Sequence, residues 1–359
     1  MKSASNKVLI YRLGSLGDTV IALPCFHIVK DVFPDADITL LTNKPVVAKA
    51  APLEAVLGNE YFFDRVLAYP VGTRNLKLLL QLIKQIRALK IDTLVNLTAA
   101  RSKKAAIRDK WFFRAAGIKN LIGFPTEEAD FEPARDQLTG YYEWEADRLV
   151  NRVRSLKQIL LDDEHYWDLR LTVKEIKAAD DAIAELIPDK PIIAVSAGTK
   201  MESKDWEEDN WVALVKSLNL YLSDYQLVVI GAPEEWERSE RCLNVWDGKG
   251  VNLCGKTSPR VSAEILRRAS VFIGHDSGPM HLAACVGTPC VAIFSGRNLP
   301  KQWYPRGENN RVIHHLPECA GCKLEVCTIK QKECIRSVSV NEVLHAVLDV
   351  LNIPININE

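Results

Sequence analysis

The chain lacks a long apolar run, an excess of charge of one sign, an internal repeat and a low-complexity segment. Among its 359 residues, Lys and Arg total 46 and Asp and Glu total 46, so the formal net charge is +0. This balance gives no support for a nucleic-acid-binding protein, which usually carries a basic excess. No uncharged apolar stretch approaches the roughly 20 residues that span a bilayer, so no transmembrane helix is expected.

The N-terminus also lacks the pattern of a secretion signal. Its apolar run before Arg12 is too short for the core of a signal peptide. We therefore expect a cytoplasmic protein whose nine cysteines are reduced. Peripheral contact with the inner face of the plasma membrane stays open.

What the sequence does contain is a regular alternation of short apolar runs and amphipathic stretches. Strands are predicted at 7–13, 36–42, 91–98, 191–198, 225–233, 250–255, 270–278 and 288–296. Helices are predicted at 18–33, 75–89, 146–161, 208–222, 234–243, 261–269 and 278–287. This alternation is typical of an α/β protein with parallel, doubly wound sheets.

Two Rossmann-like domains fit this pattern, one at residues 1–175 and one at 176–359. A polar, aromatic stretch over 123–145 separates the two sets of strands. Ligands of doubly wound sheets bind at the carboxyl ends of the strands. We therefore expect the active site in a cleft between the two domains.

The first motif is RLGSLGDTVIALP, in which a strand runs into Gly14, Ser15 and Gly17. Glycines in such a turn allow the backbone to approach a ligand closely. Asp18 is predicted to open the next helix, where Asp is a favoured N-cap. A carboxylate at this place can also accept a proton from an acceptor hydroxyl, and the two roles are compatible.

The second motif is SAGTKMESKDW, which follows the first strand of the second sheet. It forms a polar loop that contains Ser196, Gly198 and Thr199. Lys200 and Lys204 bring positive charge to this loop, which suits a diphosphate leaving group. The alternative is a solvated loop with surface lysines.

A third motif, VIGAPEEWE, places Glu234 and Glu235 after a glycine turn at a strand end. An acidic residue there often accepts hydrogen bonds from ribose hydroxyls. Acidic residues are also favoured in the first turn of any helix. This motif alone is therefore a weak signal.

The fourth motif, FIGHDSGPMHLAACVGTPCVAIFSG, is the most specific. A strand ends in Asp276, Ser277 and Gly278, and His281 lies in the first turn of the helix that follows. Backbone amides at a helix N-terminus bind anions. A structural role for the histidine is the alternative.

The first, second and fourth motifs together resemble glycosyltransferase family 9, the heptosyltransferases of lipopolysaccharide core assembly, over residues 7–297. The resemblance implies the GT-B fold and a metal-independent, inverting transfer of a sugar, with ADP-heptose as the leading donor and a lipopolysaccharide-core or related lipid-linked glycan as acceptor. It assigns Asp18 as the base and Lys204 as the group that neutralises the diphosphate. It places ribose contact on Glu235 (or Glu234), and donor contact on Asp276, Ser277, Gly278 and His281.

The acceptor side is less defined by sequence. Arg101, Lys103, Lys104 and Arg108 form a basic run that can meet phosphorylated groups of a lipid-linked glycan. Such a run is also typical of a solvated helix face.

Near the C-terminus, four cysteines lie within sixteen residues: Cys319, Cys322, Cys327 and Cys334. In a reduced protein this spacing suggests a structural metal site, most simply tetrahedral zinc, with iron as the alternative. His314 or His315 can replace one thiolate. A cluster of free thiols, or a disulfide formed on oxidation, is the other reading. Cys25, Cys242, Cys254, Cys285 and Cys290 are expected in the core.

Two other functions fit the same architecture. A nucleotide-sugar epimerase would turn over its substrate without an acceptor. A non-catalytic sugar-nucleotide-binding protein would not need Asp18. An NAD-dependent dehydrogenase is rejected because no G-x-G-x-x-G follows a predicted strand.

Overall fold

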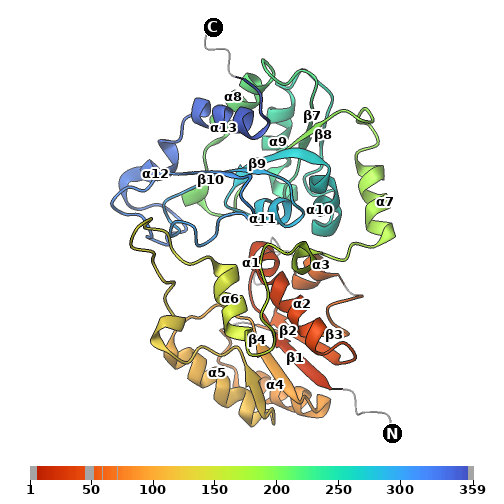
Figure 1. Cartoon of the computed structure of the whole chain (residues 1–359), viewed down its shortest axis with the longest axis vertical. Helices are drawn as coiled ribbons and strands as arrows, with labels where there is room; N and C mark the ends of the chain where they lie inside the picture. The colour runs from red at the N-terminus through yellow and green to blue at the C-terminus, as the bar shows by residue number, and fades with distance from the viewer. Residues whose placement is uncertain (1–5, 45–51, 59, 71, 355–359) are drawn as a thin grey trace. The chain divides into compact units, whose positions relative to one another are not determined.

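The computed structural model describes residues 6–44, 52–58, 60–70 and 72–354. The chain divides into two compact units, residues 1–170 and 171–359, and each is described by itself (Figure 1). The division falls five residues before the boundary predicted from sequence. Thr172 caps helix α7 (Val173–Ala182), whose Glu175 pairs with Arg260 at 2.6 Å, so this segment packs within the second unit.

The first unit contains a five-stranded parallel sheet with the order β3-β2-β1-β4-β5. Its strands are β1 (Lys7–Tyr11), β2 (Asp37–Asn43), β3 (Arg65–Tyr69), β4 (Thr93–Asn96) and β5 (Asn120–Ile122). The chain moves outward in one direction from β1 to β3 and then returns to β4 on the other side of β1. The carboxyl ends of β1 and β4 therefore form a switch point, where doubly wound sheets bind ligands.

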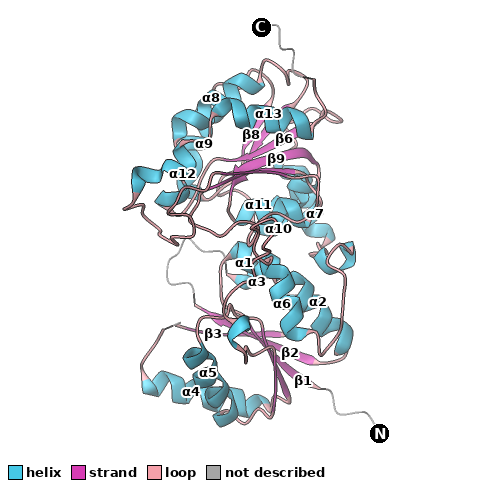
Figure 2. Cartoon of the chain, turned by 60° about the vertical axis from the view of Figure 1, so that its left-hand side comes forward, coloured by secondary structure: helices cyan, strands magenta, loops and turns pink. Residues whose placement is uncertain are grey.

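Helices cover both faces of this sheet (Figure 2). Helices α4 (Leu76–Leu89) and α5 (Lys103–Ala115) pack Leu82, Ile86 and Phe113 against one face. On the other side lie α1 (Leu16–Ile21), α2 (Leu23–Val32), α3 (Leu53–Leu57) and α6 (Glu145–Val153).

The second unit contains a six-stranded parallel sheet with the order β11-β10-β9-β6-β7-β8. Its strands are β6 (Ile192–Ser196), β7 (Gln226–Val229), β8 (Gly250–Asn252), β9 (Ala269–His275), β10 (Cys290–Phe294) and β11 (Arg311–His314). The switch point lies between β6 and β9. Most residues of the central strands are apolar and fully buried, as expected for strands covered on both faces.

The core on one face of this sheet is built around two buried tryptophans, Trp206 and Trp211. Helices α8 (Glu208–Leu218), α9 (Trp236–Leu243) and α13 (Val340–Val350) contribute to it. Helix α11 (Gly278–Cys285) packs against β9 and β10 and contacts α10 (Pro259–Arg267), which in turn contacts α7. The short helix α12 (Glu333–Arg336) follows the cysteine-rich segment.

All eight predicted strands are present, with ends shifted by a few residues. The unpredicted strands β3, β5 and β11 are short and only partly buried, so they lack a strong apolar pattern. The single helix predicted over 18–33 is wrong, because the chain breaks at Ala22, ahead of Pro24. The helix predicted over 146–161 ends at Val153, and Leu160 beyond it is largely exposed.

No helix among the described residues is long and apolar enough to cross a membrane.

A buried histidine ties the end of the first unit to helix α2. His27 is fully buried, and its Nε2 lies 2.8 Å from the carbonyl oxygen of Asp168, to which it donates. Burial lowers the pKa of His27 to about 4, and the neighbouring His165 and Arg170 act in the same direction. The folded state therefore favours the neutral ring at neutral pH.

Acid should destabilise the first unit through His27. Its folded pKa lies below the usual value, so the unfolded chain binds more protons as the pH falls from about 6.5 toward 4. Between pH 7 and pH 5 this one group should cost about 2 kcal/mol of unfolding free energy. In His27→Gln, which keeps a donor, urea unfolding should show a smaller loss over this interval. The exposed His345→Gln is the control, and an unchanged pH dependence in His27→Gln would contradict the assignment.

Candidate functional site

In the first unit, the candidate site is the turn after β1. Gly14 has φ of 145°, and a Cβ at this position would lie 2.5 Å from the Cβ of Asp18. Any side chain here would therefore displace Asp18. The Gly14 amide donates to Asn43 Oδ1 at 3.2 Å, which joins the turn to the end of β2.

The sequence predicted that Asp18 opens its helix, and this prediction is wrong. Helix α1 begins at Leu16 with Ser15 as N-cap, so Asp18 lies in the third helical position and Gly17 in the second. Asp18 Oδ2 accepts from the Ser15 amide and the Ser15 hydroxyl, each at 2.7 Å. This is the acidic half of a capping box. The side chain is 31% exposed, and Oδ1 lies 3.9 Å from the Arg12 guanidinium.

Arg12 is a buried positioning group that the sequence analysis did not identify. Its guanidinium donates to the carbonyl oxygens of Leu97 and Asp18, and so links the ends of β1 and β4 beneath the helix. Burial lowers the pKa of Arg12, whereas the charges of Asp18 and Glu145 raise it. No sequence pattern marks this residue, because Leu97 is 85 positions away.

In the second unit, the predicted residues converge at the carboxyl ends of β6, β7 and β9. Lys204 is brought by a 3₁₀ turn (Glu202–Lys204) after β6. Its ammonium donates to Asp276 Oδ2 at 2.7 Å and to the Asp276 carbonyl oxygen at 2.9 Å. The two side chains are only 12% and 6% exposed.

The contact with Lys204 keeps the Asp276 carboxyl group ionised despite its burial. Burial alone would raise the pKa of Asp276, but the charges of Lys204 and His281 bring it below its usual range. Asn298, which follows β10, donates to Asp276 Oδ2 at 2.5 Å. Sequence reasoning missed Asn298, since it lies outside the four motifs.

Helix α11 begins beside the pair. Ser277 is its N-cap residue, yet the Ser277 hydroxyl is buried and has no hydrogen-bond partner in the described part of the chain. A buried, unpartnered hydroxyl at a helix N-terminus suits an anion, which the amides of the first turn can also bind. His281 is buried one turn later, with Nε2 4.0 Å from Asp276 Oδ1.

Glu235, rather than Glu234, points into the loops of the second unit's site. The Glu235 carboxylate accepts from the Ala232 amide at 2.9 Å, whereas Glu234 is exposed. A Cβ on Gly198 would lie 1.9 Å from Glu235 Cδ, and one on Gly231 would lie 2.3 Å from Oε2. The carboxylate therefore occupies a slot that only glycines leave open. Burial raises the pKa of Glu235.

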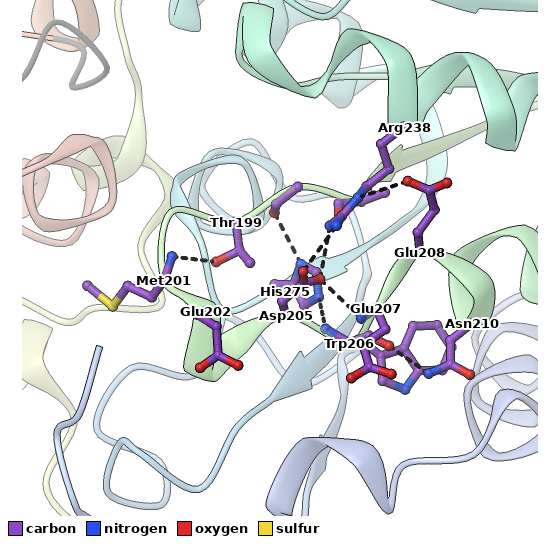
Figure 3. A network of polar contacts seen from close by, with 12 residues as sticks. Thr199, Met201, Glu202, Asp205, Trp206, Glu207, Glu208, Asn210, Arg238 and His275 are labelled. Carbon is purple, nitrogen blue, oxygen red and sulfur yellow. Dashed lines mark hydrogen bonds and ion pairs between the residues drawn. The ribbon is translucent and has the colours of Figure 1, made fainter. Parts of the chain in front are cut away.

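A network of hydrogen bonds and ion pairs joins the loop after β6 to the end of β9 and to helix α9 (Figure 3). The Trp206 amide donates to His275 Nε2 at 3.1 Å, so the His275 Nδ1–H donates to the Gly198 carbonyl at 3.1 Å. Burial lowers the pKa of His275 to about 4, which keeps the ring neutral. Arg238 binds both carboxylate oxygens of Asp205, at 2.9 and 3.0 Å.

The remaining predicted residues of this loop differ in their surroundings. Ser196 ends β6 and is buried. The Thr199 hydroxyl accepts from the Met201 amide at 3.4 Å, within the loop itself. Lys200 is exposed, so the structure brings Lys204 and not Lys200 to Asp276.

The cysteine-rich segment (319–334) holds the Lys204 turn from the other side. The Ser203 amide donates to the Glu325 carbonyl at 3.0 Å, and the Ser203 hydroxyl to the Leu324 carbonyl at 2.7 Å. Glu202 accepts from the Cys327 amide at 2.9 Å. The segment thus fixes the position of the turn that presents Lys204.

The four thiols of this segment, those of Cys319, Cys322, Cys327 and Cys334, line one small cavity. Within the described residues, however, no three His, Cys, Asp or Glu side chains are arranged to hold a metal ion. Cys327 Sγ instead lies 2.6 Å from the Ile329 carbonyl, to which it donates. The donor set suits zinc or iron, but its present geometry is that of free thiols.

Histidine replacement of a thiolate is not supported. His314 contacts the Tyr304 hydroxyl at 3.0 Å, and His315 lies 3.0 Å from a carboxylate oxygen of Glu342. Neither residue lines the cysteine cavity. The other cysteines are all buried, as predicted: Cys25, Cys242, Cys254, Cys285 and Cys290.

The chain is similar to known proteins over most of its length. Residues 79–333 match glycosyltransferase family 9 (heptosyltransferase). The chain is 23% identical over 357 residues to lipooligosaccharide heptosyltransferase 2 of Campylobacter jejuni, covering 96% of this chain and 98% of that protein.

Solved structures are similar over nearly the whole chain. A glycosyl transferase family 9 protein from Veillonella parvula has a TM-score of 0.72 at 17% identity, covering 98% of this chain and 99% of that one. Escherichia coli ADP-heptose lps heptosyltransferase II has a TM-score of 0.66 at 16% identity, with 96% and 98% covered. The chain therefore belongs to glycosyltransferase family 9 and is a glycosyltransferase with the GT-B fold.

Proposed function

We propose that the chain transfers a heptose from ADP-heptose to a glycan of the lipopolysaccharide core, with inversion at the anomeric carbon. The observation that carries the proposal is the buried Lys204–Asp276 pair beside the unpartnered Ser277 hydroxyl at the start of α11. These groups suit a diphosphate. The names of the Campylobacter and Escherichia relatives support heptose as the sugar.

The leaving group would be stabilised in the second unit. An ammonium group has three hydrogens, and two of those on Lys204 are used by Asp276. The third can bind an oxygen of the diphosphate as its negative charge develops. The amides at the start of α11 act in the same way, and Glu235 receives the ribose hydroxyls.

The acceptor hydroxyl would be activated in the first unit. Asp18 Oδ2 is held by Ser15, which leaves Oδ1 to take the proton as the hydroxyl oxygen attacks the anomeric carbon. The bond to the diphosphate breaks on the opposite face of the sugar, which gives inversion. No metal ion takes part in this scheme. The reaction is expected on the cytoplasmic side of the membrane.

Removing the base should abolish transfer without loss of donor binding. In Asp18→Asn, which keeps an acceptor for Ser15, ADP release in the presence of acceptor should fall by about 10²- to 10⁴-fold. ADP affinity measured by calorimetry should not change. The control is Glu132→Gln, an exposed acid in the same unit. Conversion of the nucleotide sugar to an isomer without acceptor would favour the epimerase, and full activity in Asp18→Asn would contradict the assigned base.

The two lysines of the second motif provide a matched pair. Lys204→Gln should lower kcat by about 10²-fold, because it removes a charge that stabilises the leaving diphosphate. It should also weaken ADP binding. The exposed Lys200→Gln should leave both quantities near wild type. Equal effects of the two substitutions would show that Lys204 acts only through general surface charge.

We also propose a structural metal ion, zinc or iron, in the cavity lined by the four thiols. The four cysteines that line one cavity support it, and the side chains must rearrange to form a tetrahedral site. The ion would stabilise the segment that holds the Lys204 turn and would take no part in the transfer step.

Metal content tests this proposal directly. Protein purified under reducing conditions should contain roughly one zinc or iron per chain by mass spectrometry. Cys322→Ser should lose the metal and lower the melting temperature. Cys254→Ser, whose sulfur already contacts the Ser239 hydroxyl at 3.0 Å, should retain it. Metal-free wild-type protein with an unchanged melting temperature after zinc addition would refute the site.

A further inference from the structure

Helices α4 and α5 present one outer surface of the first unit. Both helices pack on the same face of the sheet, through Leu82 and Ile86 of α4 and Phe113 of α5 (Figure 2). They are joined by Arg87, whose guanidinium donates to the Ala115 carbonyl at 2.6 and 3.0 Å. Their opposite sides therefore point outward together.

That outer side exposes large apolar residues in a regular arrangement. Leu76 and Leu80 lie four residues apart on α4 and are 73% and 58% exposed. Ile107 and Trp111 repeat the spacing on α5, at 48% and 72%. Residues four apart lie on one side of a helix, so each helix carries an apolar stripe that the described residues do not cover. Such grouped exposure marks an interaction surface.

The same segment is strongly basic in a chain that is neutral overall. Between residues 74 and 114 there are eleven Lys and Arg but two Asp and no Glu. Asp109, one of the two, is paired with Arg101 at 3.3 Å and Arg108 at 2.7 Å. Lys103 and Lys104 on α5, and Lys77 and Lys84 on α4, are exposed and lie beside the apolar stripes.

The position of these helices relates the surface to Asp18. Helix α4 follows β3 and α5 follows β4, so both helices begin at the carboxyl edge of the sheet. The turn that carries Asp18 follows β1 at the same edge. A surface that binds the first turns of α4 and α5 would therefore lie on the Asp18 side of the first unit.

We infer that the outer face of α4 and α5 docks on an anionic phospholipid bilayer. The lysines and arginines meet lipid phosphates, while Leu76, Leu80, Ile107 and Trp111 enter the headgroup boundary. A basic helix face with Leu and Trp on the same side suits this environment, and tryptophan favours the membrane interface. An acidic protein surface would match the charge but would not explain the two apolar stripes as well as a bilayer does. The docking is independent of the sugar that the enzyme transfers.

Vesicle flotation tests the inference without donor or acceptor. The wild-type chain should bind vesicles of phosphatidylglycerol and phosphatidylethanolamine, and bind phosphatidylcholine vesicles far less. Trp111→Ser/Leu80→Ser and Lys103→Glu/Lys104→Glu should each weaken binding about tenfold or more. The matched control is Leu220→Ser/Lys249→Glu, since both residues are exposed in the second unit. Circular dichroism melts should be the same for all variants.

Trp111 also reports insertion directly. The fluorescence emission of Trp111 is the difference between the spectra of wild type and Trp111→Phe. On vesicle addition this emission should shift to shorter wavelength and become protected from quenching by iodide. Unchanged emission and quenching, or equal binding by the variants and the control, would overturn the inference. So would a dimer or a protein complex that forms through this face in lipid-free solution and blocks vesicle binding. Because no substrate is present, none of these results depends on the heptosyl-transfer proposal.

Discussion

The ion pair between Lys204 and Asp276 is the contact on which the second unit's site depends. Both groups are nearly buried, and removing two charges from water is costly unless the remaining polar atoms are satisfied. Here Asn298 and the Asp276 backbone carbonyl complete the arrangement. The loops after β6, β9 and β10 are thereby held together by one carboxylate. Loss of either partner would leave a buried charge, which typically costs 3–5 kcal/mol, or about a third of a domain's stability.

In the first unit, the candidate carboxylate is held mainly by hydrogen bonds and not by a buried ion pair. Strand β1 ends in a turn where Gly14 leaves room for Asp18, and Ser15 donates twice to one carboxylate oxygen. Arg12 fixes the backbone below by binding two carbonyl oxygens. Asp18 is thus oriented by hydrogen bonds while its other oxygen stays accessible. This combination suits the proposed base, because a carboxylate closed into a tight ion pair would be a poor proton acceptor.

The sequence predicted the α/β architecture well because the central strands are buried on both faces and appear as continuous apolar runs. The short outer strand β3 has no such pattern. The motifs identified Lys204 and Asp276, but not their contact, which spans 72 positions. Arg12 and His275 were missed for the same reason, because each acts through partners that are distant in sequence, whereas Asn298 lies outside the motifs. The helix start at Leu16 was missed because Asp and Ser both cap helices well.

The cysteine-rich segment positions residues that are distant from it in the sequence. Its backbone holds Ser203 on one side and, through the Gly321 and Lys323 amides, the carbonyls of Gly296 and Arg297 on the other. These two loops deliver Lys204 and Asn298, which both bind Asp276. The segment has few apolar residues of its own, so these hydrogen bonds fix its position. Whatever orders the four thiols therefore also sets the spacing of the groups around Asp276.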